Sequence, residues 1–101
     1  MEVTSIPNSG GTCLQVRGAL TIADLDPLRD ALLEALHRSP TLLLDLSGVD
    51  ECDAAGIQLL CSARNHPAVR IGSLPTPISE TAAALGLSTE ALIAEDATDG
   101  I

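Results

Sequence analysis

The chain has 101 residues, contains no Phe, Tyr or Trp, and carries a formal net charge of −9 because 14 acidic residues outnumber 5 basic ones. A chain of this length builds one core, so we expect residues 1–101 to form a single domain. The acidic field repels phosphate backbones and anionic headgroups, and the missing rings remove the stacking platforms of single-strand binders. Nucleic acid and acidic membrane surfaces are therefore poor partners, and we expect neither nucleic-acid binding nor direct membrane insertion.

The basic residues and the cysteines exclude further kinds of site. All five basic residues are Arg, so no Lys can cradle a nucleotide phosphate or form a Schiff base. Cys13, Cys52 and Cys61 lack the spacing of a zinc site or a disulfide framework, which favours reduced thiols. The sequence shows no signal peptide and no run near the ~20 apolar residues of a spanning helix. We therefore expect a cytoplasmic protein without a cofactor or metal.

The start of the chain predicts a β-hairpin. Residues 3–6 and 13–16 suit short strands, and Pro7-Asn8-Ser9-Gly10-Gly11 between them is strong turn chemistry because glycine adopts positive φ at little steric cost. Gly18-Ala19-Leu20-Thr21 then leads toward a helix.

That first helix is expected to be capped by Asp24 or Asp26, with Pro27 in its first turn, where a missing N–H costs nothing. Ser39-Pro40 should end it, because the residue before Pro is pushed out of the helical region. Its apolar face repeats at spacings of three and four residues and consists of Leu25, Leu28, Leu32 and Leu36.

The stretch from Leu42 to Leu60 organises the rest of the chain. Residues 42–46 are apolar except for Asp45 and suit a strand covered on both faces, and Ser47-Gly48 is expected to end it. An acidic loop follows, and then a helix over 54–64. Asp53 is expected to cap this helix by accepting a hydrogen bond from the backbone N–H of Ala55 or Gly56. Loops at the carboxyl ends of strands are where function collects in α/β sheets.

Residues 69–74 predict a further strand, which makes strand, helix and strand a parallel crossover unit. Thr76-Pro77 should open a third helix and Gly86 should close it. A short amphipathic segment over 90–94 and a frayed end over 96–101 complete a domain with an ordered core of about 3–95. The predicted fold class is α/β: a small mixed β-sheet, made of an N-terminal hairpin plus parallel crossover strands, packed against helices.

Several side chains could carry chemistry, but none forms a catalytic motif. The acidic cluster is of the kind that holds Mg²⁺ or Ca²⁺, yet its spacing matches no calcium loop and a solvated turn explains it. Glu51 and Asp53 flank Cys52 and disfavour a thiolate there. A metal- or thiol-dependent enzyme therefore ranks below a binding role; its residues would be Asp45, Asp50, Cys52 and Asp53.

The central stretch resembles the signature of the STAS domain family, the anti-sigma factor antagonists and related bacterial regulators. Asp45-Leu46-Ser47-Gly48-Val49 followed by Asp53-Ala54-Ala55-Gly56-Ile57 carries the resemblance, and Gly18-Ala19-Leu20-Thr21 and Ala84-Leu85-Gly86-Leu87 are weaker matches. The resemblance implies a STAS-like fold, no catalysis, and a protein partner that docks on the strand-loop-helix surface 47–58. The implied contact residues are Ser47, Asp50, Glu51, Asp53, Ala54, Ala55, Gly56, Ile57 and Gln58.

Ala54 occupies the position where phosphorylated members of that family carry Ser or Thr. In those members the modifying kinase is an ATP-binding anti-sigma factor. A phosphoryl group at the first helical position would meet unpaired backbone N–H groups and add charge to the docking surface. Because Ala54 has no hydroxyl, the resemblance implies a module that is not switchable by phosphorylation at this position.

Two kinds of partner protein are consistent with the sequence. The first is an ATP-binding anti-sigma factor kinase, with a chemotaxis or stress-signalling scaffold as a variant. The second is the ATPase of a phospholipid-trafficking ABC transporter, because Gly56-Ile57-Gln58-Leu59-Leu60 resembles the STAS subunit of such transporters. The sequence leaves open which partner binds, the oligomeric state, and whether another Ser or Thr is phosphorylated.

Overall fold

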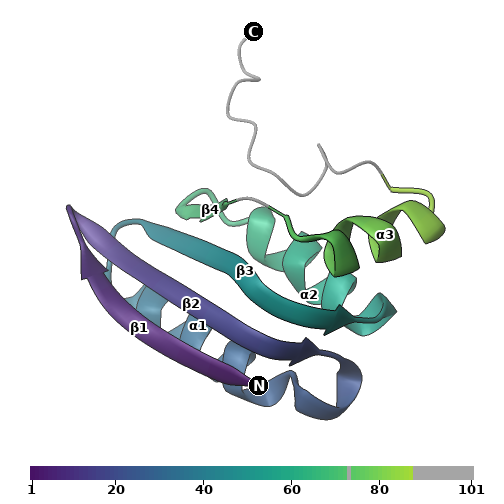
Figure 1. Cartoon of the computed structure of the whole chain (residues 1–101). Helices are drawn as coiled ribbons and strands as arrows, with labels where there is room; N and C mark the ends of the chain where they lie inside the picture. Colours follow the sequence, from purple (N-terminus) through teal and green to yellow (C-terminus); the bar gives the residue numbers. More distant parts are fainter. Residues whose placement is uncertain (73, 88–101) are drawn as a thin grey trace, which may run out of the picture.

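The computed structural model describes residues 1–72 and 74–87, which form a four-stranded mixed sheet with helices packed against it (Figure 1). The sheet order is β1-β2-β3-β4; β1 and β2 are antiparallel, and the other two pairs are parallel. The predicted α/β fold with a hairpin and parallel crossover strands is confirmed. The elements are β1 (Glu2–Asn8), β2 (Gly11–Leu20), the 3-10 turn η1 (Ile22–Asp24), α1 (Asp26–Arg38), β3 (Leu42–Cys52), α2 (Ala54–Arg64), β4 (Val69–Ile71) and α3 (Thr76–Ala84).

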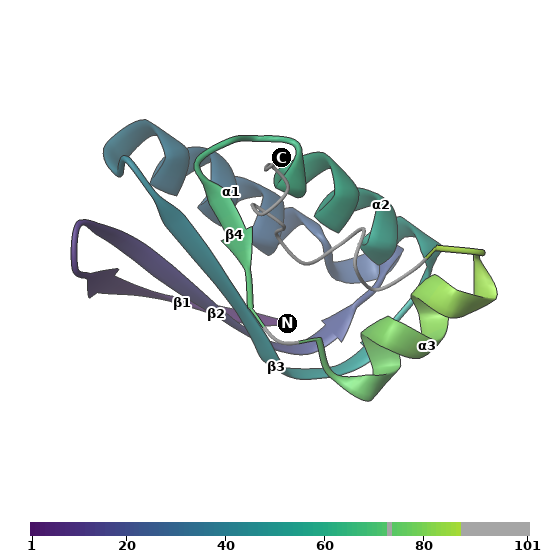
Figure 2. The same ribbon diagram turned by 90° about the horizontal axis from the view of Figure 1, so that it is seen from above.

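The helices lie in two places. α1 and α2 cover one face of the sheet (Figures 1 and 2). Among residues 1–72 and 74–87, no helix covers the other face, which we call the uncovered face. α3 lies beside β3 beyond the short β4, which pairs only with Leu42 to Leu44. The Thr81 hydroxyl donates to the Cys52 backbone oxygen at 3.1 Å, so α3 covers the edge of β3 that β4 leaves unpaired.

The core is aliphatic throughout, as the absence of aromatic rings requires. Alternate residues of β2 and β3 point toward the helices because side chains alternate across a strand. They meet the apolar stripe predicted on α1, of which Leu25, Leu28 and Leu32 are buried. The largest side chains of this core that are less than 2 % exposed are Leu14, Val16, Leu20, Leu28, Leu42, Leu44, Leu46, Ile57, Leu60 and Ile78.

The start of α1 differs from the prediction. Its N-cap is Leu25, which makes no side-chain capping hydrogen bond, so neither Asp24 nor Asp26 caps it as expected. Asp24 ends η1 instead and accepts a hydrogen bond from the amino group of Met1 at 3.2 Å. Pro27 does lie in the first turn, and α1 ends at Arg38 as predicted.

The last elements are shorter than predicted, and α3 begins differently. β4 ends at Ile71, not Leu74. Thr76 is the first residue of α3 and not its cap. Gly86 does close α3: with φ of +82° it donates to the Ala83 oxygen at 3.0 Å, while the Leu87 N–H donates to the Ala82 oxygen at 2.9 Å. The predicted segments 90–94 and 96–101 lie outside the described residues.

Candidate functional site

β3 continues to Cys52, so the predicted acidic loop after Ser47-Gly48 is wrong. Two β-bulges let the strand continue. Gln15 is opposite Asp45 but Arg17 is opposite Gly48, and a second shift places Asp50 as the extra residue between Val49 and Glu51. Each bulge inserts one residue into β3 without ending its pairing with β2. Because of the first bulge, the side chain of Val49, and not that of Gly48, is the next to be buried after Leu46.

Gly48 marks a close approach between strands and not a strand end. A Cβ at this position would lie 2.5 Å from Cγ of Arg17 and 3.0 Å from the backbone oxygen of Val16. Glycine inside a strand commonly signals a bulge or such an approach. The residue that suggested a turn in the sequence is therefore explained by the neighbouring strand β2.

Asp53 alone separates β3 from α2, and it is the predicted N-cap. One carboxylate oxygen accepts from the Gly56 N–H at 3.0 Å, and the other accepts from the Ile22 N–H at 3.1 Å. The Asp53 N–H donates to the Leu20 oxygen at 3.2 Å. The N–H groups of Ile22 and then of Gly56 hold the pKa of the Asp53 carboxyl below its ordinary value. Asp53 therefore joins η1 to the start of α2, besides capping the helix.

The first turn of α2 divides the predicted contact residues into two groups. Ala54 and Gln58 are exposed, and Ala55 is half-buried. Gly56 and Ile57 are buried, Ile57 to 1 % exposure, so these two residues face the core in this fold. Their contact with a partner stays a prediction. A Cβ on Gly56 would lie 2.3 Å from the Leu20 oxygen, which explains why glycine stands there.

Ser47 lies apart from this turn. It belongs to the bulge on the uncovered face of the sheet, where its hydroxyl donates to the Asp45 carboxylate at 2.7 Å and its N–H donates to the same oxygen at 3.1 Å. Asp45 is thus held by its own strand. The predicted site residues that remain exposed near the start of α2 are Asp50, Glu51, Ala54 and Gln58.

Ile22 is a surface residue that the sequence did not single out. Its side chain is 74 % exposed, although its N–H is fixed by Asp53. Nothing in the local pattern marks it, because the contact that places it joins residues 31 positions apart. We call the surface formed by Ile22, Asp50, Glu51, Ala54 and Gln58 the junction surface.

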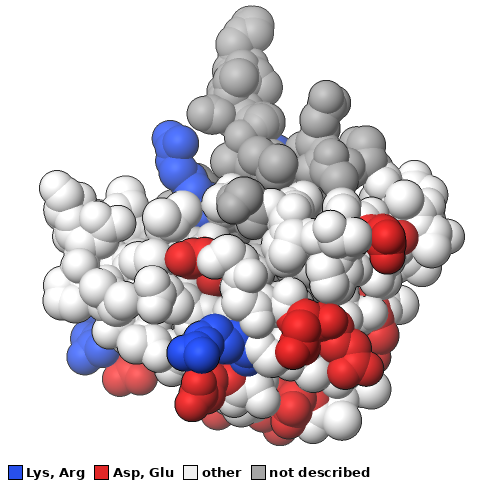
Figure 3. Space-filling model, viewed as in Figure 1, with Lys and Arg blue, Asp and Glu red and all other residues white. Residues whose placement is uncertain are grey.

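The junction surface is acidic because β2 and β3 are parallel, so their carboxyl ends meet at one edge of the sheet. Figure 3 shows acidic side chains gathered over these strand ends. Asp24 and Asp26 follow β2, and Asp50 and Glu51 lie in the last three residues of β3. The local field therefore attracts a positively charged surface.

The described residues give no support for metal or thiol chemistry. Within residues 1–72 and 74–87, no three His, Cys, Asp or Glu side chains are grouped so that they could hold a metal ion. Burial, and secondarily the Asp53 carboxylate, raises the pKa of the Cys52 thiol to about 11, although a hydrogen bond with Thr81 lowers it. The Cys52 thiol is therefore protonated at neutral pH and a poor nucleophile.

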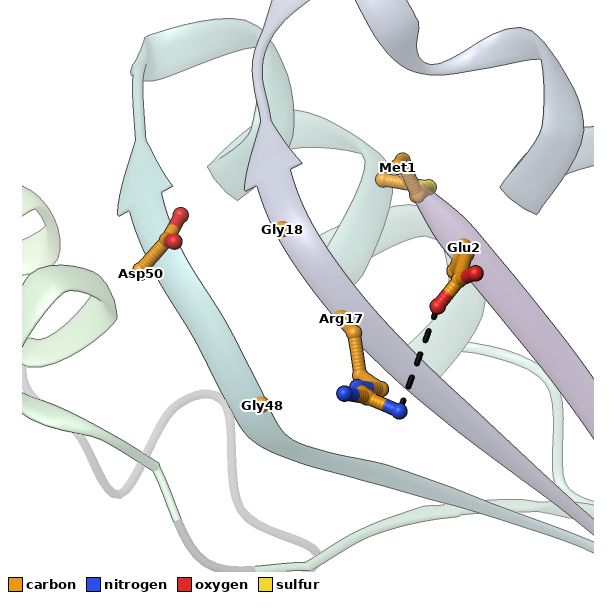
Figure 4. Close-up of a pocket in the computed structure, with 6 residues that line it drawn as sticks. All are labelled: Met1, Glu2, Arg17, Gly18, Gly48 and Asp50. Carbon is orange, nitrogen blue, oxygen red and sulfur yellow. Dashed lines mark ion pairs between the residues drawn. The ribbon is translucent and has the colours of Figure 1, made fainter.

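A shallow polar pocket of about 360 Å³ lies on the uncovered face of the sheet and shares Asp50 with the junction surface (Figure 4). Arg17 and Glu2 form an ion pair across it at 3.9 Å, and both side chains are mostly exposed. No nucleophile with an adjacent base lines it; the lining residues are Met1, Glu2, Arg17, Gly18, Gly48 and Asp50. Among the described residues, no helix is long and apolar enough to cross a membrane.

Comparison with known proteins gives a family and a fold. The family model described as "Mlab, STAS domain" matches residues 7–94. A solved structure titled "Crystal Structure Analysis of Mglu" is similar with a TM-score of 0.62 at 18 % identity, over 72 % of this chain and 20 % of that one. The chain thus spans about a fifth of that protein's length, and the likeness concerns the fold alone. No curated protein matches.

Proposed function

The chain belongs to the STAS domain family, and on that premise we propose that it is a non-catalytic regulatory module that binds a partner protein through the junction surface. STAS domains generally mediate protein-protein interactions and are generally non-catalytic. One observation carries the proposal for this chain. Asp53 fixes the start of α2 with hydrogen bonds inside the fold, and Ala54, which directly follows the acidic residues Asp50, Glu51 and Asp53 in the chain, is left exposed.

The absent hydroxyl at Ala54 sets the mode of regulation. Ala54 is the first residue of α2 and is exposed, which is where an added phosphoryl group would meet the positive end of the helix. With a methyl group in its place, the module is constitutively competent to bind, or it is regulated elsewhere. This follows the resemblance to the anti-sigma factor antagonists, in which the modified residue occupies this position.

The chemistry of the junction surface favours a partner with a basic patch. Its charged residues are carboxylates, while Ala54 and Ile22 add small and apolar contacts. Charge complementarity of this kind speeds association and selects among partners more than it adds affinity. The first candidate partner is an ATP-binding anti-sigma factor kinase, which also implies a cytoplasmic location.

A second candidate is the ATPase of a phospholipid-trafficking ABC transporter. The resemblance of residues 56–60 to the STAS subunit of such transporters favours it, and the matching family model is the one described as "Mlab, STAS domain". Within that stretch, Gln58 is exposed while Gly56, Ile57 and Leu60 are buried, so Gln58 is the residue of the five best placed to touch an ATPase.

Affinity capture with matched variants tests both candidates. Wild-type chain should recover an ATP-binding protein, identified by mass spectrometry as a kinase-like anti-sigma factor or a transporter ATPase. Ala54→Arg should lose that protein, and Asp50→Lys should recover less of it. Asp30→Lys, which changes the same charge at an exposed position of α1, should retain it. Equal recovery by all four chains would show that the junction surface is not the docking site.

The captured protein then tests the absent switch. If it is a kinase, incubation with ATP should leave the mass of the wild-type chain unchanged, whereas Ala54→Ser should gain one phosphoryl group. Phosphate on the wild-type chain, for example at Ser47 or Ser62, would contradict the proposal that this module is not switched by that kinase.

A further inference from the structure

β1 is the long unpaired edge of the sheet among the described residues. It has seven residues and pairs on one side only, with β2. At the opposite edge β4 has three residues, and α3 lies along the rest of β3. A long open edge presents backbone donors and acceptors that another strand can pair with.

The hydrogen-bond pattern shows which residues of β1 face outward. The Thr12 N–H donates to the Thr41 oxygen at 3.1 Å, so the backbone N–H of Thr12 faces β3 and is not bonded to β1. Thr12 is opposite Pro7 in β1, so Pro7 and Thr12 form a non-hydrogen-bonded pair. The backbone carbonyl of Pro7 therefore faces the open edge of the sheet and not β2. Because antiparallel pairs alternate between bonded and non-bonded, Val3 and Ser5 point outward as well. Val3 and Ser5 offer both an N–H and a carbonyl, while Pro7 offers only a carbonyl.

This edge carries none of the usual protection except Pro7. Residues 3–8 include no charged side chain, and Ile6 is 37 % exposed. The one charge within β1, Glu2, is already matched by Arg17 at 3.9 Å. Natural edges commonly carry Lys or an inward-pointing charge to prevent pairing. Pro7 limits pairing to the stretch around Val3 and Ser5.

We infer that this edge pairs with a second copy of the chain, antiparallel, with Thr4 on the two-fold axis. In that register Val3 of each copy faces Ser5 of the other, so every outward N–H and carbonyl of these two residues is satisfied. Centring the axis on Ser5 would place Val3 opposite Pro7 and leave its carbonyl without a donor. The self-complementary arrangement of the outward backbone groups is what identifies a second copy as the occupant.

The dimer is a weak one that forms with rising concentration. Pairing over a few residues buries less than the roughly 1,200 Å² of a stable interface. It uses β1 and not the junction surface, so it stands whether or not the proposed function does. The two sheets join into one continuous sheet across the axis.

Sedimentation equilibrium of the full chain tests the dimer. Wild type should shift from monomer toward dimer as concentration rises toward the millimolar range. Ser5→Pro removes an outward N–H that takes no part in the β1-β2 ladder, and it should weaken dimerisation by about tenfold or more. Ser5→Ala keeps that N–H and should dimerise as wild type does. Circular dichroism and thermal melts confirm that both variants fold. A wild type that stays monomeric, or a Ser5→Pro variant with unchanged affinity, overturns the inference.

Cross-linking tests the register independently. Thr4→Cys places two thiols on the axis, in a non-bonded pair where Cβ atoms approach closely. It should oxidise readily to a covalent dimer whose disulfide maps to the two introduced thiols. Glu2→Cys should not, because its two copies lie four residues apart along the paired strands. Equal cross-linking of the two variants would exclude this register.

Discussion

Because Gly56 has no Cβ, α2 can pack closely against the end of β2. Glycine inside a helix is normally less stable than alanine by about 1 kcal/mol. Here an alanine Cβ would lie 2.3 Å from the Leu20 oxygen and 3.2 Å from the Cys52 sulfur. We expect Gly56→Ala to reduce the free energy of unfolding by about 1–3 kcal/mol, measured in urea. Gln58→Ala, at an exposed position of the same helix, is the control; a stabilised Gly56→Ala would refute the contact.

Asp53 gives the fold a dependence on acid. Its carboxyl pKa is lowered in the folded chain, first by the Ile22 N–H and then by the Gly56 N–H. A lowered folded pKa adds stability that is present above the ordinary Asp value of about 3.9 and is lost as pH falls through the folded value. Asp53→Asn should therefore be less stable than wild type near pH 7, with the difference shrinking below about pH 4. Urea unfolding at both pH values measures this, and a difference that grows in acid would contradict it.

The elements whose signals are local were predictable from the sequence. The hairpin, α2 with its Asp53 cap, and the Gly86 stop all depend on residues within a few positions of one another. The length of β3 was not predictable, because its bulges depend on the register with β2. For the same reason Ser47-Gly48 suggested a turn, when a distant strand required the glycine. In the site, Asp53 could be found by its cap spacing, but its bond to Ile22 could not.

A double mutant can test whether the neighbouring strand β2 is the reason that glycine is needed at position 48 in the β3 bulge. A Cβ on Gly48 would meet Cγ of Arg17, so Gly48→Ala should destabilise the sheet by about 1–3 kcal/mol. Arg17→Ala removes that Cγ, and Gly48→Ala should cost less in its background. The remaining cost comes from the Val16 oxygen, 3.0 Å away. A double-mutant cycle in urea measures the coupling, and strictly additive effects would show that Arg17 is not the obstacle.

At the scale of the whole molecule, the net charge of −9 means that added salt should stabilise the fold but weaken the binding of a basic partner. The folded chain brings its carboxylates closer together than the unfolded chain does, and the side-chain ion pairs, such as Arg29 with Asp26 at 3.6 Å, are exposed and weak. Raising NaCl from about 10 mM to about 150 mM shortens the Debye length from roughly 30 Å to 8 Å, so the melting temperature should rise. A melting temperature that falls would mean that attractive pairs outweigh the repulsion.

The same salt should weaken the docking of a basic partner, because the carboxylates of the junction surface then attract it less. The association rate should fall more than the dissociation rate rises. Stopped-flow mixing with the captured partner measures both rates. Asp50→Lys should flatten the salt dependence of the association rate more than Asp30→Lys does, because both change the total charge equally and only the first lies on the junction surface. Equal slopes would mean that net charge alone attracts the partner, and that the placement of carboxylates at the ends of β2 and β3 does not matter.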